Sequence, residues 1–437
     1  MSPARFCVVF LAASVALAAT VAAFNAIVDP YAIFDAPRHP GFNARTPAVA
    51  TRERMMKAYQ APRVSARAVI LGSSRTDLGL DPASAAWPAQ VGPVYNLSLV
   101  GDQASTGLKY LRHMMASSPG GANIHTLVVG LDFEAFLFKP AVAGPVPVEP
   151  VELSEIDERL LVDASGQPNP RRSVRVLTDQ AIALLSLDAL GDSAATIAAS
   201  RSLTGADLLP NGKLADTPFR HNMRDDGAMA VFDQKNSQTV AQYAAPHRML
   251  SEAPNGPIRH LHAVREILAL AKVHGMTVIL AVQPAHVSRL ELLDRMGYWD
   301  DYERWKRALA ALVAGETAAG RAVALWDFGG YEPYAQEEVP AKSARQAMMK
   351  WFWDPVHYTS ALGDVMLARM FGPSGDAGYG IRLTPENVEA RLAAIRTDRA
   401  VFRATNPVET ARLAALCGRA CPAPAVIAPP PRVARGN

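Results

Sequence analysis

Two adjacent serines follow a short apolar run in the stretch ILGSSRT. Ser73 and Ser74 come directly after residues 68–71, where a buried strand is predicted to end. A serine hydroxyl becomes a good nucleophile only when a nearby imidazole takes its proton and a carboxylate orients that imidazole. The stretch WFWDPVHYTS supplies both groups, since Asp354 and His357 are three positions apart around a proline turn. Ser74, His357 and Asp354 are therefore candidates for a serine-nucleophile site.

Such a site also needs hydrogen-bond donors for the anion that forms on the attacked carbonyl oxygen. A backbone N–H in the turn around Ser74 is one candidate, and the backbone of Gly101, in NLSLVGD, is another. Ligands of open α/β sheets bind at the carboxyl ends of the strands. Asp132 and His286 follow two further predicted strands, so they are candidates for the same edge. Arg75 or His286 could assist the oxyanion there.

Each of these blocks also has a purely structural interpretation. GSSR after a strand is an ordinary turn, DPVH is a helix-entry turn, and Gly101 can be only a turn glycine. A structural role is favoured for His286, and Asp132 is either a turn residue or a site residue. Arg75 either binds an anionic substrate group or pairs with Asp77 or Asp132. The blocks indicate a site because they occur together, in order, in one predicted domain.

Apolar runs that alternate with amphipathic helices must position these residues. Buried parallel strands are predicted at residues 68–71, 93–99, 124–133, 276–284 and 321–328. Helical spacing is found at residues 104–117, 258–275, 291–314 and 358–371. This alternation predicts an α/β fold of three layers, flavodoxin-like, in which helices flank a central parallel sheet.

The 437 residues divide into four predicted regions. The uncharged segment Phe6–Val28 is long enough to cross a bilayer, so residues 1–28 are predicted to be a transmembrane anchor; a cleaved signal peptide is the alternative. Residues 29–65 are predicted to be a tether. Residues 66–383 form the α/β domain, with a helical and loop insertion at about 139–256. Residues 384–437 carry helices and then a disordered Pro/Ala-rich tail.

Charge and cysteine usage exclude several classes of protein. Arg5 before the apolar segment predicts an inner-membrane anchor with the main domain outside the cytoplasm, in the periplasm. A net charge of +3 without a basic cluster argues against nucleic-acid binding. Three cysteines exclude a disulfide scaffold or a Cys-rich zinc module, although Cys417 and Cys421 are either a disulfide or two free thiols. The sequence predicts no cofactor and no metal.

The stretches ILGSSRT, NLSLVGD, VVGLDF and DPVHYT, in this order, resemble the four blocks of the SGNH (GDSL-type) hydrolase superfamily. The resemblance covers roughly residues 66–371. It implies that Ser74 is the nucleophile, that Asp354 and His357 complete a triad, and that Gly101 is an oxyanion donor. The chain departs from the pattern twice, since Ser73 replaces an aspartate and Asp132 replaces the asparagine that helps to hold the oxyanion.

The anchor and the resemblance together predict an extracytoplasmic serine esterase or O-acyltransferase, similar to membrane-anchored periplasmic members of the superfamily. Its expected partners are a cell-envelope polysaccharide or an acylated small molecule, the inner membrane and a membrane acyl-donor protein. The alternative is a catalytically silent envelope protein of the same fold that binds glycan or a membrane partner. The distances discriminate between the two: an enzyme is favoured if Ser74 Oγ, His357 and Asp354 form a connected chain at the strand edge.

Overall fold

The computed structural model describes residues 2–117, 123–139, 151–202, 205–244, 247–253, 255–372, 376, 378–418 and 421, except for the side chains of residues 151–154. Its centre is a sheet of six strands in the order β2-β1-β3-β4-β5-β6. The strands are β1 (Ala68–Leu71), β2 (Val94–Asn96), β3 (Thr126–Leu131), β4 (Thr277–Val282), β5 (Val323–Asp327) and β6 (Ile381–Arg382). The first five are parallel, which confirms the predicted α/β class.

The sixth strand was not predicted. It has only two residues, both exposed, and pairs antiparallel with β5 at the edge of the sheet. A segment this short carries no alternation of apolar and polar side chains, which is the signal that identifies a strand in a sequence. It follows the last long helix of the domain and closes one edge of the sheet.

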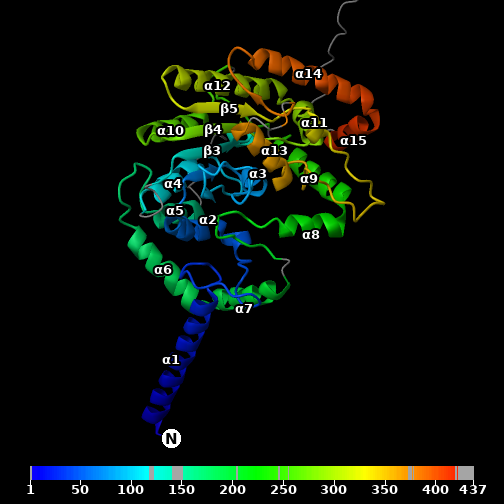
Figure 1. Ribbon diagram of the computed structural model, residues 1–437. Helices are drawn as coiled ribbons and strands as arrows, with labels where there is room; N and C mark the ends of the chain where they lie inside the picture. Colours follow the sequence, from blue (N-terminus) through cyan, green and yellow to red (C-terminus); the bar gives the residue numbers. More distant parts are fainter. Residues whose placement is uncertain are drawn as a thin grey trace, which may run out of the picture.

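Helices cover both faces of the sheet (Figure 1). The long ones in the domain are α4 (Ala104–Met115), α10 (Leu261–Val273), α12 (Trp299–Ala318), α13 (Ser360–Phe371) and α14 (Val388–Thr405). Alternate strand residues point to opposite faces, so Val69 and Leu71 pack in the core beneath α4, α10 and α12. Ala68 and Ile70 pack instead with Leu367 of α13. The sheet is therefore buried on both sides, as parallel sheets normally are.

The N-terminal helix α1 (Pro3–Val28) projects from the opposite end of the molecule from α14 (Figure 1). Its most apolar stretch has a mean hydropathy of 2.4, and none of that stretch is buried. A helix of 26 residues is about 39 Å long, which exceeds the roughly 30 Å hydrocarbon core of a bilayer. This helix is therefore long and apolar enough to cross a membrane.

The segment predicted to be a tether is packed against the rest of the protein. Tyr31 and Ile33 are buried, and the two carboxylate oxygens of Asp29 accept hydrogen bonds from the backbone of Ile33, Phe34 and Ala36. Helix α2 (Val49–Gln60) follows, and a short turn of 3-10 helix (Ala61–Arg63) leads to β1. The aromatic and proline-rich composition that suggested a linker instead builds a small core of its own.

The insertion between β3 and β4 contains helices and loops, as predicted. It contains α5 (Val151–Arg159), α6 (Arg172–Leu185), α7 (Leu187–Ser202), α8 (Thr217–Asp226) and α9 (Ala228–Tyr243). Helices α6 and α7 pack beside α1, whereas α8 and α9 pack beside α13 and α11 (Val287–Arg295) (Figure 1). One insertion thus reaches both the end of the molecule from which α1 projects and the carboxyl edge of the sheet.

The C-terminal region begins with α14 and α15 (Pro407–Cys417). Cys417 and Cys421 form a disulfide, which settles the alternative left open by the sequence. The remaining tail, residues 422–437, for which disorder was predicted, lies outside the described residues. The described part of the C-terminal region packs on α12 and α11, away from α1.

Candidate active site

The strand order places the candidate residues at a switch point of the sheet. From β1 the chain continues to β2 on one side, whereas β3 lies on the other side of β1, so the strand order reverses at this point. In doubly wound sheets, ligands bind in the crevice at such a reversal. Leu71 of β1 lies opposite Val129 of β3, so the two strands end at the same edge. Ser74 begins the short helix α3 (Ser74–Gly79) directly after β1, and Asp132 follows β3.

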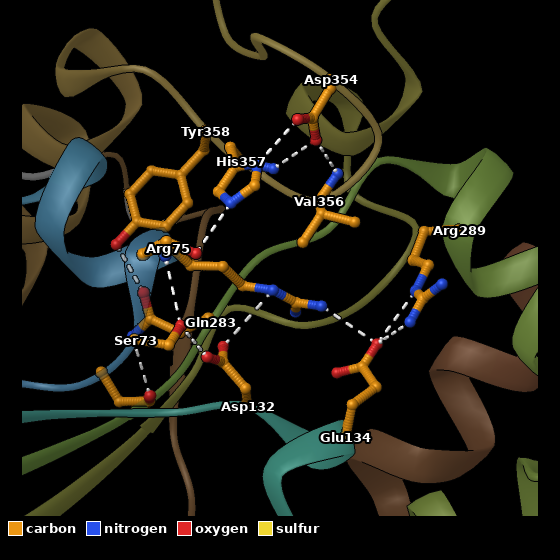
Figure 2. Close-up of polar contacts among 12 residues, drawn as sticks. Ser73, Arg75, Asp132, Glu134, Gln283, Arg289, Asp354, Val356, His357 and Tyr358 are labelled. Atoms are coloured by element: carbon orange, nitrogen blue, oxygen red, sulfur yellow. Dashed lines mark hydrogen bonds and ion pairs between the residues drawn. The ribbon is translucent and has the colours of Figure 1, made fainter. Parts of the chain in front are cut away.

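Ser74, His357 and Asp354 form one connected chain of hydrogen bonds. Ser74 Oγ lies 2.8 Å from His357 Nε2. His357 Nδ1 lies 2.6 Å from Asp354 Oδ2 (Figure 2). Asp354 and His357 are buried, so neither loses its partner to bulk water. A serine, an imidazole and a carboxylate in this order can move a proton from the hydroxyl to the ring and stabilise the resulting imidazolium.

The loop before α13 fixes the carboxylate of this chain. Asp354 Oδ1 accepts hydrogen bonds from the backbone N–H groups of Val356 and His357, at 2.7 and 2.9 Å, while Oδ2 faces the ring. Burial alone would raise the pKa of Asp354, but the adjacent His357 and these hydrogen bonds lower it to about 2. The carboxylate is therefore ionised at neutral pH, as an orienting group for an imidazole must be.

Ser73, the other hydroxyl of the pair, points away from the histidine. Its Oγ caps α3 by accepting a hydrogen bond from the Arg75 backbone at 3.2 Å, and it donates a short hydrogen bond to Asp132 Oδ2. Burial raises the pKa of Asp132, although Arg75 and Ser73 oppose that shift. The two serines therefore have different roles in the structure: one faces the imidazole, and the other links the helix to β3.

Arg75 lies between two carboxylates rather than facing open solvent (Figure 2). Its Nε is 3.5 Å from Asp132 Oδ1, and its Nη2 is 3.0 Å from Glu134 Oε1. Arg289 of α11 reaches the same Glu134 oxygen at 2.8 Å. Burial would raise the pKa of Glu134, but the two guanidinium groups lower it to about 2. Of the alternatives for Arg75, the structure shows the ion pair with Asp132; Asp77 instead pairs with Lys57, at 2.6 Å.

Gly101 lies in the loop after β2 and lines the same cavity as Ser74. Its φ of +67° is in the left-handed region, where a side chain would strain the backbone. Among the described residues, its backbone N–H has no hydrogen-bond acceptor. The neighbouring Asp102 is buried, and burial raises its pKa to about 7. The loop thus offers a free N–H beside a carboxyl group that titrates near neutral pH.

A cavity of about 540 Å³ joins these groups. The insertion supplies much of its wall, as segments inserted after a strand commonly do. The ring of Phe219, from α8, packs edge-on against His357, with ring centroids 5.2 Å apart. Sequence reasoning did not identify the other side chains of the wall, which include Glu134, Lys235, Tyr243, Arg248 and Arg289.

Only two of these residues, Glu134 and Arg289, lie at positions that the sequence could have indicated. Glu134 is two positions after Asp132, and Arg289 is three positions after His286, so both follow strands that the sequence identified. Lys235, Tyr243 and Arg248 belong to the insertion or lie just after its last helix, where no strand end marks the site. Only the tertiary packing of the insertion brings them to the cavity.

His286 does not line this cavity, although it follows β4 as predicted. Its Nδ1 lies 2.9 Å from Ser288 Oγ and its Nε2 lies 2.8 Å from the Glu337 carbonyl oxygen. Burial lowers the pKa of His286 to about 4, so the ring is neutral. It caps the start of α11, which is the structural role that the sequence favoured.

Two close backbone contacts hold the nucleophile against the base. Gly363 of α13 lies so near the Gly79 carbonyl that an added Cβ would overlap that oxygen. A Cβ on Gly79 would overlap the Tyr358 ring in the same way. The helix that begins at Ser74 therefore sits directly on the segment that carries His357. Only glycine permits this approach of two backbones.

A buried lysine fixes the other side of α3. Lys57, from α2, is fully buried and lies 2.6 Å from Asp77 Oδ2 and 3.2 Å from Glu53 Oε1. The second oxygen of Asp77 accepts a hydrogen bond from the Leu214 backbone in the insertion, at 2.7 Å. Helix α2 and the insertion thus both contact the carboxylate of Asp77, which belongs to helix α3.

Metal binding has no support in the described ranges, where no cluster of three or more histidine, cysteine or acidic side chains could hold an ion.

Comparisons of this chain with protein-family models, with curated proteins and with solved structures found no match. The functional argument therefore rests on the geometry of the site itself.

Proposed function

We propose that this protein is a membrane-anchored serine esterase or O-acyltransferase of the SGNH type that acts outside the cytoplasm on an acylated envelope glycan. The observation that carries the proposal is the connected chain from Ser74 Oγ through His357 to Asp354. It lies at the carboxyl edge of a parallel sheet and opens into a cavity. A structural histidine would not need an ionised carboxylate on one nitrogen and a serine hydroxyl on the other.

The reaction begins when Ser74 Oγ attacks the acyl carbonyl and its proton passes to His357 Nε2. Asp354 stabilises the imidazolium through its hydrogen bond to Nδ1. The carbonyl oxygen becomes an anion, which the backbone N–H groups of Ser74 and Gly101 would stabilise. When the C–O bond to the leaving alcohol breaks, His357 returns the proton to that alcohol. An acyl ester on Ser74 remains.

The acyl group then passes to water in an esterase, or to a hydroxyl of a glycan in a transferase. His357 removes the proton of the incoming hydroxyl, which attacks the acyl carbonyl. When the second tetrahedral intermediate collapses, the bond from the acyl carbon to Ser74 Oγ breaks and His357 returns the proton to Oγ. The atoms balance without any further reactant. The same residues serve both half-reactions, because the second is the chemical reverse of the first with a different alcohol.

Asp132 occupies the position where the superfamily has an oxyanion-binding asparagine, and its charge would repel an oxyanion. The pairing with Arg75 supports a neutralised carboxylate that positions the turn, rather than one that faces the substrate. The donors are then backbone groups. Arg248 and Arg289 line the same cavity, and their positive charge would attract the carboxylates of a glycan.

Two features support the proposed location. The most apolar stretch of helix α1 is exposed, as a membrane anchor requires. The Cys417–Cys421 disulfide is of the kind that persists in oxidising compartments. Fusion of a reporter after Tyr31 tests the orientation, and a cytoplasmic signal would contradict the envelope assignment.

A fluorophosphonate probe tests the enzymatic activity, because it modifies only an activated serine. We expect the wild-type protein to be labelled and Ser74→Ala to be unlabelled. Ser73→Ala is the matched control, one position away, and should keep its label because Ser73 faces Asp132. Turnover of an activated acetyl ester should follow the same pattern. An unlabelled, inactive wild-type protein would favour the silent glycan-binding alternative.

A further inference from the structure

The helices α6 and α7 have an unusual distribution of polar side chains. They meet at Ser186 with a bend of 65°, beside the end of α1 (Figure 1). Their inward faces bury polar side chains beside two alanines, Ala183 and Ala189. Asp179 of α6 bonds the Arg159 Nε at 2.6 Å and accepts a hydrogen bond from Tyr59 at 2.8 Å. Ser193 of α7 is buried and donates to the Asn25 side chain at 2.8 Å.

The outward faces, in contrast, are apolar. Large aliphatic side chains point away from the protein, with exposed fractions of 69% for Val174, 66% for Leu177, 41% for Ile182, 57% for Leu185 and 83% for Leu187. Small residues, Gly191, Ala194, Ala195 and Ala198, continue this surface along α7, and the exposed polar residues on it include Thr178, Asp188 and Arg201. A helix at a water-exposed surface buries its apolar side and exposes its polar side. These two helices do the reverse, which indicates an apolar medium outside them.

The polar inner faces also argue against α6 and α7 as a second membrane span. Although the bent pair is as apolar as a span by composition, its buried ion pair and hydrogen bonds tie it to α2, α5 and α1. A helix pair that is fixed to the protein on one side and apolar on the other is suited to lie in a membrane interface.

The end of α1 is rigidly joined to this surface. Asn25 Nδ2 donates to the Leu184 carbonyl oxygen at 3.0 Å, one residue before Leu185. Val28 and Asp29 are buried, and Asp29 is held by three backbone N–H groups. A bilayer that contains α1 must therefore end close to the bend between α6 and α7. The apolar face is continuous with the exposed side of the anchor.

We propose that the outward face of α6 and α7, around Ile182, Leu185 and Leu187, is immersed in the interfacial region of the bilayer that α1 crosses. This inference rests on the proposed role of α1 as the anchor. The bend would lie deepest, because it is nearest to the exit of α1. Two attachment points, one spanning and one interfacial, would fix the orientation of the catalytic domain relative to the membrane.

Fluorescence quenching in vesicles tests the depth of this face. The full-length protein with Cys7→Ser keeps the Cys417–Cys421 disulfide and provides a background without a free thiol. Single cysteines at Leu187, Leu17 and Val408 then carry an environment-sensitive fluorophore. Leu17 reports on α1 itself, and Val408 on α15 is the matched control, since it is 82% exposed and remote from α1. Phosphatidylglycerol/phosphatidylethanolamine vesicles carry lipid spin labels at headgroup or mid-chain depth.

We expect mid-chain labels to quench Leu17→Cys most strongly, and headgroup or shallow-chain labels to quench Leu187→Cys at least threefold more than Val408→Cys. If Leu17→Cys is quenched and Leu187→Cys is not, α1 is an anchor but the interfacial face is refuted. If neither is quenched, the anchor itself fails, and the inference with it. Protection of Leu187→Cys from aqueous iodide without quenching by lipid would identify a protein or a second copy as the occupant, which also overturns the proposal. None of these readings depends on esterase activity.

Discussion

Ser74 Oγ and His357 Nε2 are 2.8 Å apart although the two residues are separated by 283 positions in the chain. One follows the first strand of the sheet, and the other precedes the last helix that packs on it. Their contact depends on the packing of α3 against α13 rather than on any local turn. The proposed activity is therefore a property of the assembled domain, and it can be removed at either end of the chain.

Replacement of His357 by alanine is expected to abolish acyl turnover with little effect on folding. Without the imidazole, the Ser74 hydroxyl keeps its proton, and losses of about a thousandfold or more are typical. Asp354→Asn should cost about 10,000-fold, because it disturbs the tautomer of the ring. Ester hydrolysis kinetics measure both effects. His262→Ala, on the exposed face of α10, is the control. Turnover of His357→Ala within roughly tenfold of wild type would show that the triad is wrongly assigned.

Arg75 and Asp132 should behave as a coupled pair. Arg75→Ala leaves the buried Asp132 without a cation, whereas Glu134 keeps Arg289, and the loss is expected to lower the free energy of unfolding by about 3–5 kcal/mol. Asp132→Asn should cost less, since Arg75 keeps Glu134 as a partner. The double variant should recover part of the loss, because the neutral amide of the Asp132→Asn substitution needs no counter-ion. Urea denaturation gives the coupling energy, and strictly additive losses in stability and in activity would refute the pairing.

Ionisation of the buried Asp102 should lower the free energy of unfolding as pH rises. Its pKa is about 7 in the folded protein, against the ordinary 3.8, so the folded state holds the proton more tightly than the unfolded chain. The destabilisation is absent below about pH 4, develops as pH rises toward 7 and is complete above it, at most about 4 kcal/mol. Asp102→Asn should therefore be more stable than wild type at pH 8 and equal to it at pH 4. Denaturation midpoints that differ equally at both pH values would contradict this prediction.

Lys57 should be essential for stability, although it does not touch the cavity. Lys57→Met leaves the buried Asp77 without a cation beneath the nucleophile helix and is expected to cost about 3–5 kcal/mol. Lys109→Met is the matched control, because the Lys109–Asp157 pair is partly exposed to solvent and such pairs contribute about 1 kcal/mol or less. Thermal unfolding compares the two. Equal shifts in Tm would mean that the buried contact contributes no more than the surface pair.

The sequence predicted the sheet and the connected triad because both leave strong local signals. Five apolar runs ending in glycine or a polar residue identified β1 to β5, and DPVH placed a carboxylate three positions from a histidine. Ser73 and Ser74 could not be told apart in the sequence by composition alone. Their separation arises from the start of α3, where one residue caps the helix and the next begins it.

The rest depended on tertiary contacts that no local pattern encodes. Residues 29–65 have the composition of a linker, yet Tyr31 and Ile33 find apolar partners on α6 and α7. Phe219 and Lys235 reach the cavity only because the insertion folds back over the sheet edge. Glu134 acquires its role from Arg289, which lies 155 positions away.

The contact between Gly79 and Gly363 has an evolutionary consequence. A side chain at Gly363 would push the two backbones apart, and one at Gly79 would displace the ring of Tyr358, the neighbour of His357, so neither glycine can change without a compensating change around it. Substitutions there should be tolerated only where selection on the hydroxyl–imidazole pair has ceased. In any distant relative, glycines at both positions would mark a working site even if the surrounding loops had diverged, and their loss would mark a descendant that kept the fold and abandoned the reaction.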